Sequence, residues 1–341
     1  MSGVVHALDF SRWKRRPLRL CFPDSRVVCI SSADKIPDGA TLALWGMRAV
    51  PDGATGRGIE VVRVEDGFLR SVGLGADLIR PVSWVVDRRG MYFDATRPSD
   101  LEALLSEAEF DDHLLRRAAA LRARIVKAGL TKYNVGASAW RRPADAARVI
   151  LVPGQVESDA SIAYGAPTIK TNIGLLQAVR SANPEAYLVY KPHPDVVAGL
   201  RACGEGEKEA ERWCNEVAEN VDMGALLAEI DEVHVLTSLT GFEALLRGKG
   251  VTCYGQPFYS GWGLTADIVP VARRTRRLSL DQLVAGALIL YPRYLSRHAD
   301  MLISPEQALE ELAAWRARSG GMAPWWRRLF RVALRRVVGV R

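Results

Sequence analysis

Three short polar clusters follow apolar runs in the second half of the sequence, and they carry side chains suited to chemistry. They are GQVESDAS at 154–161, KPHPD at 191–195 and TSLTGFE at 237–243. Each comes directly after a stretch with the composition of a buried β-strand. Together they supply carboxylates, a lysine, a histidine and hydroxyls, which are groups that bind anions and transfer protons.

The KPHPD cluster places Lys191 and His193 at the end of an apolar run. Pro192 and Pro194 fix φ and remove two backbone donors, so a strand must stop here. One interpretation is an ordinary exit from the strand, with charges that face water. The other is a site in which a cation and an imidazole face an anion.

The TSLTGFE cluster lies where a predicted strand passes into a predicted helix. Ser238, Thr240 and Gly241 would put hydroxyls and backbone N–H groups at the positive end of the helix dipole, which favours a phosphate. Thr240 and Glu243 also have the spacing of a capping box, which needs no ligand. The sequence has neither GxGxxG nor GxxxxGK[ST], so neither a dinucleotide fingerprint nor a P-loop is present.

Two pairs of acidic residues also follow predicted strands. Glu157 and Asp159 lie in GQVESDAS, and Glu65 and Asp66 precede Arg70 in VEDGFLR. Solvated loop acids would give the same pattern. Opposite the phosphate-binding clusters, however, a carboxylate could act as a nucleophile on a sugar carbon or as a general base. In a two-domain enzyme, the pair in the first half would face a second substrate across a cleft.

The first half of the chain is predicted to form short strands, separated by turns rich in Pro, Gly and Asp, at 26–30, 42–46 and 60–64. A long helix is expected from about 100 to 127, with Ser99 or Asp100 as its cap and Gly129 as its stop. Residues 131–148 have few apolar anchors and suit a crossing between domains.

The second half alternates predicted strands with predicted helices. In order, these segments are 148–154, 171–183, 186–194, 222–230, 232–238, 240–249 and 251–257. The alternation predicts a parallel, Rossmann-like sheet, in which ligands bind beyond the carboxyl ends of the strands. All three polar clusters come at those ends, which favours a site. His234, in the middle of a predicted strand, is expected to be a packed core histidine.

Composition indicates a globular protein of 341 residues, of which 48% are apolar and 25% charged. The five cysteines are scattered and form no CxxC or zinc pattern, so we expect reduced thiols in a cytoplasmic protein. The first residues have no apolar core of signal-peptide length. The longest apolar stretch, at 283–291, is far shorter than the roughly 20 residues that a spanning helix needs.

The net charge of +7 comes from the C-terminal tail. Eight arginines and no acidic residue follow from Arg316 onward, which leaves 38 basic and 39 acidic residues in the rest of the chain. No basic stripe with interleaved aromatics and no known nucleic-acid motif is present, so nucleic-acid binding is not expected. At helical spacing, the arginines at 327, 328, 331 and 335 share one face of the tail, opposite Trp326 and Phe330.

Such a tail predicts an interfacial helix on an anionic membrane. The alternative is a C-terminal helix that docks on the body, with solvated arginines. With the membrane interpretation, we expect a peripheral protein on the inner face of the inner membrane.

Several long motifs resemble one family. They are VEDGFLRSVGLGADLIRPVSWVVDRRGMYFDATRPSDLE, VPGQVESDASI, VYKPHPDVV, TSLTGFEALLRGKGVTCYGQPFYSGWGLT and YPRYLSRHADMLISPEQALEEL. In this order they are similar to the retaining β-Kdo transferases of bacterial capsule assembly, over roughly residues 40–315. The resemblance is strongest to the C-terminal module of the two-module enzymes that build the Kdo linker on a glycolipid. This chain has one such module where those enzymes have two.

The resemblance implies an α/β, GT-B-like fold, with two Rossmann-like domains and the active site in the cleft between them. Residues 1–145 would form the acceptor-side domain and 146–315 the CMP-sugar domain, followed by the basic amphipathic tail at 316–341. The implied reaction moves Kdo from CMP-Kdo to a lipid-linked, Kdo-terminated acceptor in capsular linker synthesis. Two successive displacements through Asp159 would retain the anomeric configuration.

The resemblance also assigns roles. His193 and Pro194 match the motif that contacts the nucleotide phosphate, and Asp159 matches the catalytic aspartate. The expected catalytic residues are Asp159, Glu65 and His193. The expected substrate-binding residues are Asp66, Arg70, Gln155, Glu157, Ser161, Lys191, Pro194, Ser238, Thr240, Gly241 and Glu243. No metal and no cofactor is expected. Expected partners are CMP-Kdo, the lipid-linked glycan, the membrane surface and a second Kdo transferase.

Two alternatives remain open at this point. One is another GT-B-like enzyme of nucleotide sugars, such as a UDP-sugar transferase or an epimerase. The other is a non-catalytic scaffold in capsule assembly, which would be expected to have a degraded acidic or His-Pro motif. Both motifs are intact in this sequence.

Overall fold

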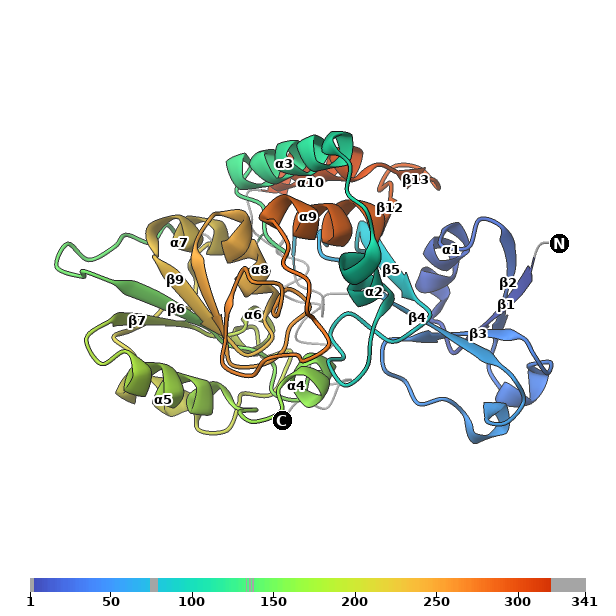
Figure 1. Ribbon diagram of the computed structural model, residues 1–341, viewed down its shortest axis with the longest axis horizontal. Helices are drawn as coiled ribbons and strands as arrows, with labels where there is room; N and C mark the ends of the chain where they lie inside the picture. The colour runs from blue at the N-terminus through green and yellow to red at the C-terminus, as the bar shows by residue number, and fades with distance from the viewer. Residues whose placement is uncertain (1–2, 74–78, 133, 135, 137, 320–341) are drawn as a thin grey trace.

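The computed structural model describes residues 3–73, 79–132, 134, 136 and 138–319, and it contains two α/β units, each built around its own sheet (Figure 1). The strands are β1 (Gly3–Leu8), β2 (Ser25–Ile30), β3 (Thr41–Trp45), β4 (Glu60–Asp66), β5 (Ser83–Asp87), β6 (Val149–Pro153), β7 (Tyr187–Lys191), β8 (Glu216–Val217), β9 (Glu232–Val235), β10 (Gly250–Cys253), β11 (Ala266–Asp267), β12 (Arg293–Leu295) and β13 (Leu302–Ile303).

The α-helices are α1 (Arg12–Leu20), α2 (Asp100–Glu107), α3 (Asp112–Lys127), α4 (Ala160–Gly165), α5 (Asn172–Ala182), α6 (Pro194–Val197), α7 (Met223–Glu229), α8 (Leu239–Leu246), α9 (Leu280–Val284) and α10 (Pro305–Ser319). A π-helical segment, Ala285–Leu290, directly follows α9.

The second unit holds the parallel sheet that the sequence predicts. Its order is β11-β10-β9-β6-β7-β8, and every neighbouring pair is parallel. The central strand β6 is buried along its whole length, as expected for a strand covered on both faces. The predicted strands and helices of this half are all confirmed, with Thr171 capping α5 as its sequence suggests.

The first unit has a mixed sheet of order β13-β12-β5-β4-β3-β1-β2. The strands β4, β3, β1 and β2 run parallel to one another, whereas the pairs β4–β5, β5–β12 and β12–β13 are antiparallel. The three strands predicted in this half correspond to β2, β3 and β4. An α/β fold with two sheets is therefore confirmed, although one edge of the first sheet departs from a purely parallel arrangement.

Each sheet has one point at which the chain reverses the direction in which it adds strands. In the first sheet, β2 lies on one side of β1 and β3 on the other. In the second, β7 lies on one side of β6 and β9 on the other. In open α/β sheets, such a topological switch point is where ligands bind, beyond the carboxyl ends of the two strands.

The long helix predicted over 100–127 is wrong in one respect, because it is two helices, α2 and α3. Asp111 caps α3 by accepting a hydrogen bond from Leu114 N at 2.7 Å. The guanidinium of Arg276 donates to the carbonyls of Leu105, Ser106 and Ala108 just before the break. At this break, a capping aspartate and a distant arginine therefore bind backbone groups that would pair with each other in one continuous helix. The expected start at Ser99 and stop at Gly129 are confirmed.

The chain returns to the first unit after completing the second. The sequence division placed residues 146–315 in one domain, yet β12 and β13 hydrogen-bond to the first sheet through β5. The helix α10 then lies beside α3 (Figure 1), where Arg117 forms a two-pronged ion pair with Glu306, at 2.7 and 3.0 Å. This correction could not be made from local sequence, because strand pairing across the chain is a tertiary property. The boundary at residue 145 stays a prediction.

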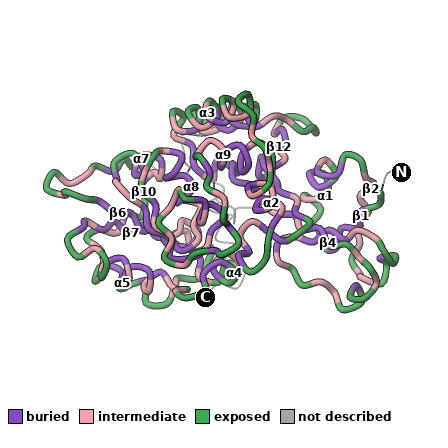
Figure 2. The backbone as a smooth tube through the Cα atoms, viewed as in Figure 1, coloured by how far each residue is buried: buried purple, intermediate pink, exposed green. Residues whose placement is uncertain are grey.

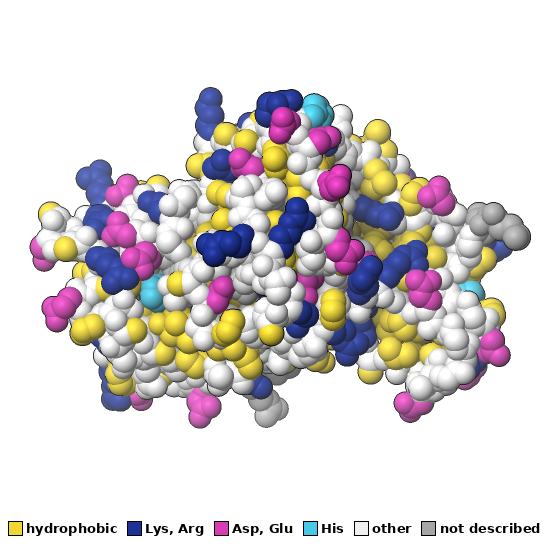
Figure 3. All heavy atoms as spheres, in the orientation of Figure 1, with side chains coloured by type: hydrophobic (Ala, Val, Ile, Leu, Met, Phe, Trp, Pro, Cys, Tyr) yellow, Lys and Arg dark blue, Asp and Glu magenta, His cyan; other side chains and the backbone are white. Residues whose placement is uncertain are grey.

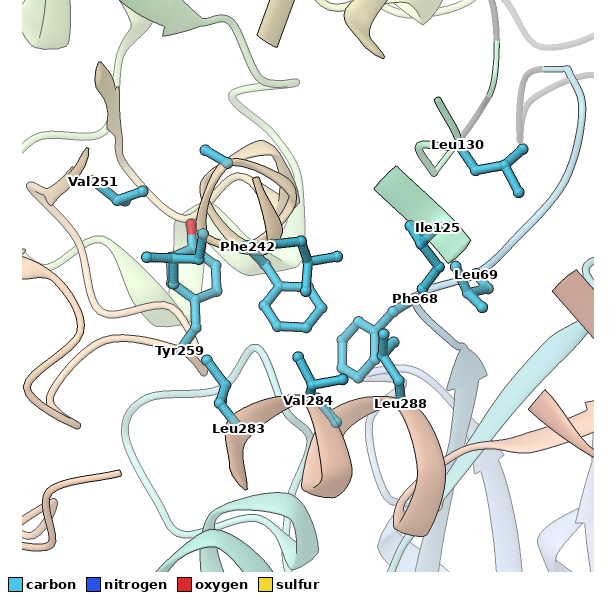
Figure 4. Close-up of a cluster of buried hydrophobic side chains, with 14 of the residues drawn as sticks. Phe68, Leu69, Ile125, Leu130, Phe242, Val251, Tyr259, Leu283, Val284 and Leu288 are labelled. Atoms are coloured by element: carbon cyan, nitrogen blue, oxygen red, sulfur yellow. The ribbon is translucent and has the colours of Figure 1, made fainter. Parts of the chain in front are cut away.

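An aromatic cluster packs the two units together. Phe68 of the first unit lies 4.5 Å from Phe258 and 6.1 Å from Phe242, measured between ring centroids. Figure 4 shows Phe68 and Phe242 facing the residues Val284 and Leu288, which lie on α9 and the helical turn that follows it. The central strands are buried, whereas the outer side of α3 is exposed (Figure 2). The core therefore continues from one unit into the other.

A buried ionic contact reinforces this packing. Arg274 is 7% exposed and donates from Nε to Glu102 of α2 at 2.9 Å, and from Nη1 to the carbonyl of Ser260 at 3.0 Å. Arg273 forms a second ion pair with the same glutamate. Basic side chains gather around the middle of the face in Figure 3, near the position of α2 in Figure 1. These contacts fix α2 against the second unit.

Candidate active site

The side chain of Gln155 bridges the two loops at the switch point of the second sheet. Gln155, after β6, donates from Nε2 to Thr237 Oγ1 at 3.0 Å and accepts from Thr237 N at 2.9 Å, after β9. Its backbone N–H also donates to Asn172 at 2.9 Å. Gln155 therefore joins the two loops that flank the switch point and holds them in position.

Glu157 has a similar bracing position. One carboxylate oxygen accepts from Asn172 N at 2.7 Å, and the other accepts from Glu205 N at 3.0 Å. Both oxygens of this side chain therefore hold neighbouring loops in place. Its expected role toward a substrate stays a prediction.

Asp159 comes next along the same loop and caps the short helix α4. Its Oδ1 accepts from Ser161 N at 2.9 Å, and the side chain is exposed. The cap fixes the direction of the carboxylate while leaving it accessible to a ligand. Ser161 contributes its backbone N–H to this geometry.

His193 stands at the carboxyl end of the neighbouring strand β7. Its Nδ1 accepts a hydrogen bond from Asp195 N at 3.2 Å, where it caps α6, whose first residue is Pro194. Burial, and then the positive charge of Lys132, lowers the pKa of His193 to about 4, while Asp159 opposes that shift. The imidazole is therefore neutral at pH 7, and its proton lies on Nε2, which can donate to an anion.

Lys191 contacts the backbone of the second unit, and its expected role toward a substrate stays a prediction. Its side chain is 7% exposed, and Nζ donates to the carbonyls of Ala218 and Glu219, each at 3.3 Å. Burial lowers the pKa of this ammonium to about 8. The two residues of the KPHP motif thus have different surroundings: the lysine is bound to the backbone beside β8, and the histidine lies near Asp159.

The third cluster forms the start of α8, but the predicted capping box is wrong. The cap is Ser238, whose Oγ accepts from Thr240 N at 3.2 Å. Gly241 is needed for packing, because a Cβ there would collide with the hydroxyl end of Tyr259. The Tyr259 hydroxyl in turn donates to the carbonyl of Ser238. Tyr259 therefore fixes the first turn of α8.

Glu243 points toward the segment that joins the two units. It is 7% exposed, and its Oε1 accepts from Lys132 N at 2.6 Å. Burial raises the pKa of Glu243 to about 7, and Arg247 and the Lys132 amide act in the opposite direction. The carbonyl of Lys132 accepts from Ser71 N in the first unit, at 3.3 Å. The backbone of Lys132 is therefore bound to both units.

The first unit contributes Glu65, Asp66 and Arg70 at the carboxyl end of β4. Arg70 is 5% exposed and donates from Nε to Asp66 Oδ2 at 2.7 Å. Burial, and then the neighbouring Asp66, raises the pKa of Glu65 to about 8. Arg70 therefore pairs with one carboxylate, and the other stays protonated at neutral pH. A carboxyl with such a pKa is suited to general base chemistry.

The charged groups that shift each pKa show which of these side chains lie close to one another. Lys132 acts on the pKa of Glu65, His193 and Glu243, and it opposes the rise that burial causes in the pKa of Tyr92. Asp159 acts on His193, and it acts on Tyr92 alongside Glu65. Loops of both sheets thus meet around one lysine.

Lys132 is the member of this group that the sequence did not indicate. It lies in the segment interpreted as a crossing between domains, and one lysine in such a segment carries no signal. Its position is set by Asn134, which donates from Nδ2 to the carbonyls of Ser71 and Thr131, at 2.9 and 2.7 Å. Asn134 also has a positive φ of 52°, which asparagine tolerates better than most residues.

The family follows from a direct comparison. The capsule polysaccharide biosynthesis protein family matches residues 47–119 and 112–294, which is most of the chain. The chain belongs to this family. The region that matches contains Glu65, Asp159 and His193, so the family and the site coincide.

Two curated relatives support the membership in this capsule polysaccharide biosynthesis family. The chain is 46% identical over 321 residues to the capsule polysaccharide modification protein LipA of Neisseria meningitidis, which covers 92% of the chain and 46% of LipA. It is 43% identical over 317 residues to the lipopolysaccharide-processing protein LpsZ of Rhizobium meliloti, covering 88% of the chain and 72% of LpsZ. The chain thus spans about half the length of LipA.

Two solved structures share the fold. The β-Kdo 2,7 transferase of Thermosulfurimonas dismutans KpsC is 42% identical, with a TM-score of 0.74 over 92% of this chain and 100% of that one. The β-Kdo 2,4 transferase of the same KpsC is 33% identical, with a TM-score of 0.80 over 90% and 97%. The predicted GT-B-like fold class is confirmed by these matches.

Among the described residues, no helix combines the length and the apolar character that a membrane span needs. Residues 316–319 of the predicted basic tail form the end of α10. The rest of the tail, residues 320–341, on which the membrane prediction depends, lies outside the described part of the chain.

Proposed function

We propose that this protein is a retaining β-Kdo transferase, which uses CMP-Kdo as its donor in the synthesis of a capsular polysaccharide linker. The observation that carries the proposal is the meeting of Asp159 and His193 from the second unit with Glu65 from the first, around Lys132. The similarity to both KpsC transferases supports the same reaction.

The donor step would use two loops of the second sheet. Asp159 attacks the anomeric carbon of Kdo, a bond forms to its carboxylate, and the bond from that carbon to the CMP oxygen breaks. CMP leaves with the electron pair. The neutral His193 donates from Nε2 to the departing phosphate, and Lys132 adds positive charge nearby. Groups that are already oriented toward developing negative charge lower the barrier most effectively.

The acceptor step would use the first unit. Glu65, once ionised, removes the proton from the acceptor hydroxyl, and the oxygen of that hydroxyl displaces Asp159 from the anomeric carbon. Two inversions give net retention. Because the pKa of Glu65 is raised to about 8, the ionised base becomes available as the pH rises through that value.

For the position of the new bond, sequence and backbone give different indications. The 2,7 transferase has the higher identity, 42% against 33%, but the 2,4 transferase has the higher TM-score, 0.80 against 0.74. Side chains decide which hydroxyl reaches the anomeric carbon, whereas the TM-score also depends on how the two units are placed. We therefore propose a 2,7 linkage, which an NMR spectrum of the product checks directly.

The acceptor and the location in the cell belong to the same proposal. A lipid-linked, Kdo-terminated glycan would be reached from the cytoplasmic face of the inner membrane, where the basic tail would bind anionic lipids. A second Kdo transferase would act on the same glycan, because the two-module relatives combine two such units.

The test replaces the proposed nucleophile and keeps its cap. Asp159→Asn retains an acceptor for Ser161 N but cannot form the ester, so transfer should be lost while CMP still raises the melting temperature. Intact-mass analysis with CMP-Kdo alone should show a Kdo adduct on wild type at Asp159. Glu185→Ala, at an exposed position before β7, is the matched control and should keep full activity.

Three results would contradict the proposal. Near-normal turnover by Asp159→Asn would exclude the aspartyl intermediate. Stabilisation by UDP instead of CMP would favour a UDP-sugar transferase or an epimerase. No turnover and no nucleotide binding by wild type would favour a scaffold in capsule assembly.

A further inference from the structure

The switch point of the first sheet, between β1 and β3, carries no role in the donor step. The two loops that flank it are tied together, because Arg48, after β3, donates from Nη1 to the carbonyl of Asp9, after β1, at 3.0 Å. Arg63 on β4 donates to the carbonyl of Gly46 at 2.6 Å. The carboxyl ends of three parallel strands are thus held as one surface, at the place where such sheets bind ligands.

A lysine is fixed above this surface. Lys14 lies on α1, with Nζ 2.9 Å from the centroid of the Trp45 ring and 5.3 Å from that of Trp13. Burial lowers the pKa of Lys14 to about 8. Trp13 is 37% exposed, so this second indole, near the ammonium, is partly open to solvent. A cation in contact with the face of one indole ring, and within reach of a second, keeps its position without a ligand.

Charges around this lysine are arranged in favour of an anion. Asp66 and Glu65 raise the pKa of Lys14, whereas Arg48 and Arg70 lower it, so all five groups lie in one neighbourhood. Asp66 is paired with Arg70 at 2.7 Å. Because the pKa of Glu65 is raised to about 8, that carboxyl is protonated at neutral pH. Lys14 and Arg48 then leave an excess of positive charge beside the proposed general base.

We propose that Lys14 and Arg48 bind the carboxylate of an acidic sugar at the end of the acceptor. That contact places a hydroxyl of the sugar next to Glu65, and the exposed ring of Trp13 packs against the apolar side of the sugar. The inference rests on the proposed function, and it assigns the residues that recognise the acidic end of the acceptor. It predicts that a neutral sugar in the same position binds poorly.

The test measures binding without turnover. The methyl glycoside of Kdo and its carboxamide are titrated into the full-length protein, and binding is followed by calorimetry. The carboxylate compound should bind wild type about ten- to a hundredfold more tightly than the amide, as expected for hydrogen bonds between charged groups. Lys14→Met and Arg48→Met should remove that difference, and Lys14→Arg should keep most of it. Arg26→Met, on the exposed start of β2 at the opposite end of the sheet, should bind as wild type does.

The outcomes separate this inference from the proposed function. If both compounds bind equally, or if the two methionine variants bind as wild type does, the inference is overturned, whether or not the protein transfers Kdo. If CMP-Kdo gives no transfer while Lys14 still governs binding of the acidic sugar, the proposed function fails and the inference stands. With an active enzyme, Lys14→Met should raise the KM for acceptor and leave the rate of adduct formation from CMP-Kdo alone unchanged.

Discussion

Replacing Glu243 by Gln tests how the buried carboxyl couples the second unit to the loop that carries Lys132. Glu243 is 7% exposed and accepts a hydrogen bond from Lys132 N at 2.6 Å. Glutamine keeps an oxygen in the same place, so the Lys132 amide remains satisfied. The substitution removes only the ionisable group.

The magnitude follows from the pKa. Burial raises it from 4.5 to about 7, so above pH 4.5 the folded protein retains a proton that the unfolded chain releases. Glu243 therefore increasingly opposes folding as the pH rises, and its effect saturates above about pH 7. A shift of this size corresponds to about 3 kcal/mol of unfolding free energy.

Urea unfolding of wild type and Glu243→Gln at pH 4.5 and pH 8 measures this effect. The variant should gain about 3 kcal/mol relative to wild type between the two values, because every other group titrates in both proteins. A difference that does not change with pH would show that the carboxyl is not held in its neutral form. Glu243→Ala is the matched variant: it leaves the Lys132 amide without its acceptor, so it should lower Kdo transfer while Glu243→Gln does not.

Three other predictions concern separate parts of the molecule. His193→Ala should weaken CMP binding by about ten- to a hundredfold. Because the pKa of His193 is lowered to about 4, the ratio of the CMP affinities of wild type and variant should stay constant from pH 5.5 to 8. A change in that ratio near the ordinary histidine pKa would contradict a neutral donor. Arg274→Met should cost about 1–3 kcal/mol of unfolding free energy, since it leaves the carbonyls of Pro257 and Ser260 without this donor while Arg273 still pairs with Glu102. Arg212→Met, in an exposed pair, should cost less than about 1 kcal/mol. Equal costs would show that the buried contact does not join the units. Removing the chain from residue 322 onward should leave a folded protein that binds CMP and acts on a short soluble acceptor but no longer sediments with anionic liposomes. Unfolding of the truncated protein, or unchanged sedimentation, would show that the tail is structural.

The second unit was predictable because its signals are local. Apolar runs such as β6 and β7 are followed at once by loop residues, and prolines or capping residues mark where each element begins and ends. The order of strands and helices alone then implies a parallel sheet, with Asp159 and His193 at its carboxyl edge. The helix break before α3 was missed because Arg276, which binds the carbonyls there, is far away in the sequence.

Site chemistry was predictable to a smaller extent. The types and positions of Glu65, Asp159 and His193 could be read from motifs. The protonation states could not, because they depend on burial: the same imidazole would be half charged near pH 6.5 in water, and here its pKa is about 4. In the same way, the sequence does not show that the ammonium of Lys191 binds two carbonyls beside β8.

The sequence by itself determined the α/β class, the parallel strands of the second unit and the loops that carry the acidic and His-Pro motifs, because these depend on periodicity and on residues a few positions apart. Only the tertiary structure decided that β12 and β13 return to the first sheet, that Lys132 stands between the two units, and that Lys14 lies over Trp45 near Glu65. Those contacts join residues that are distant along the chain, and their strength comes from burial and strand pairing, which no local pattern records.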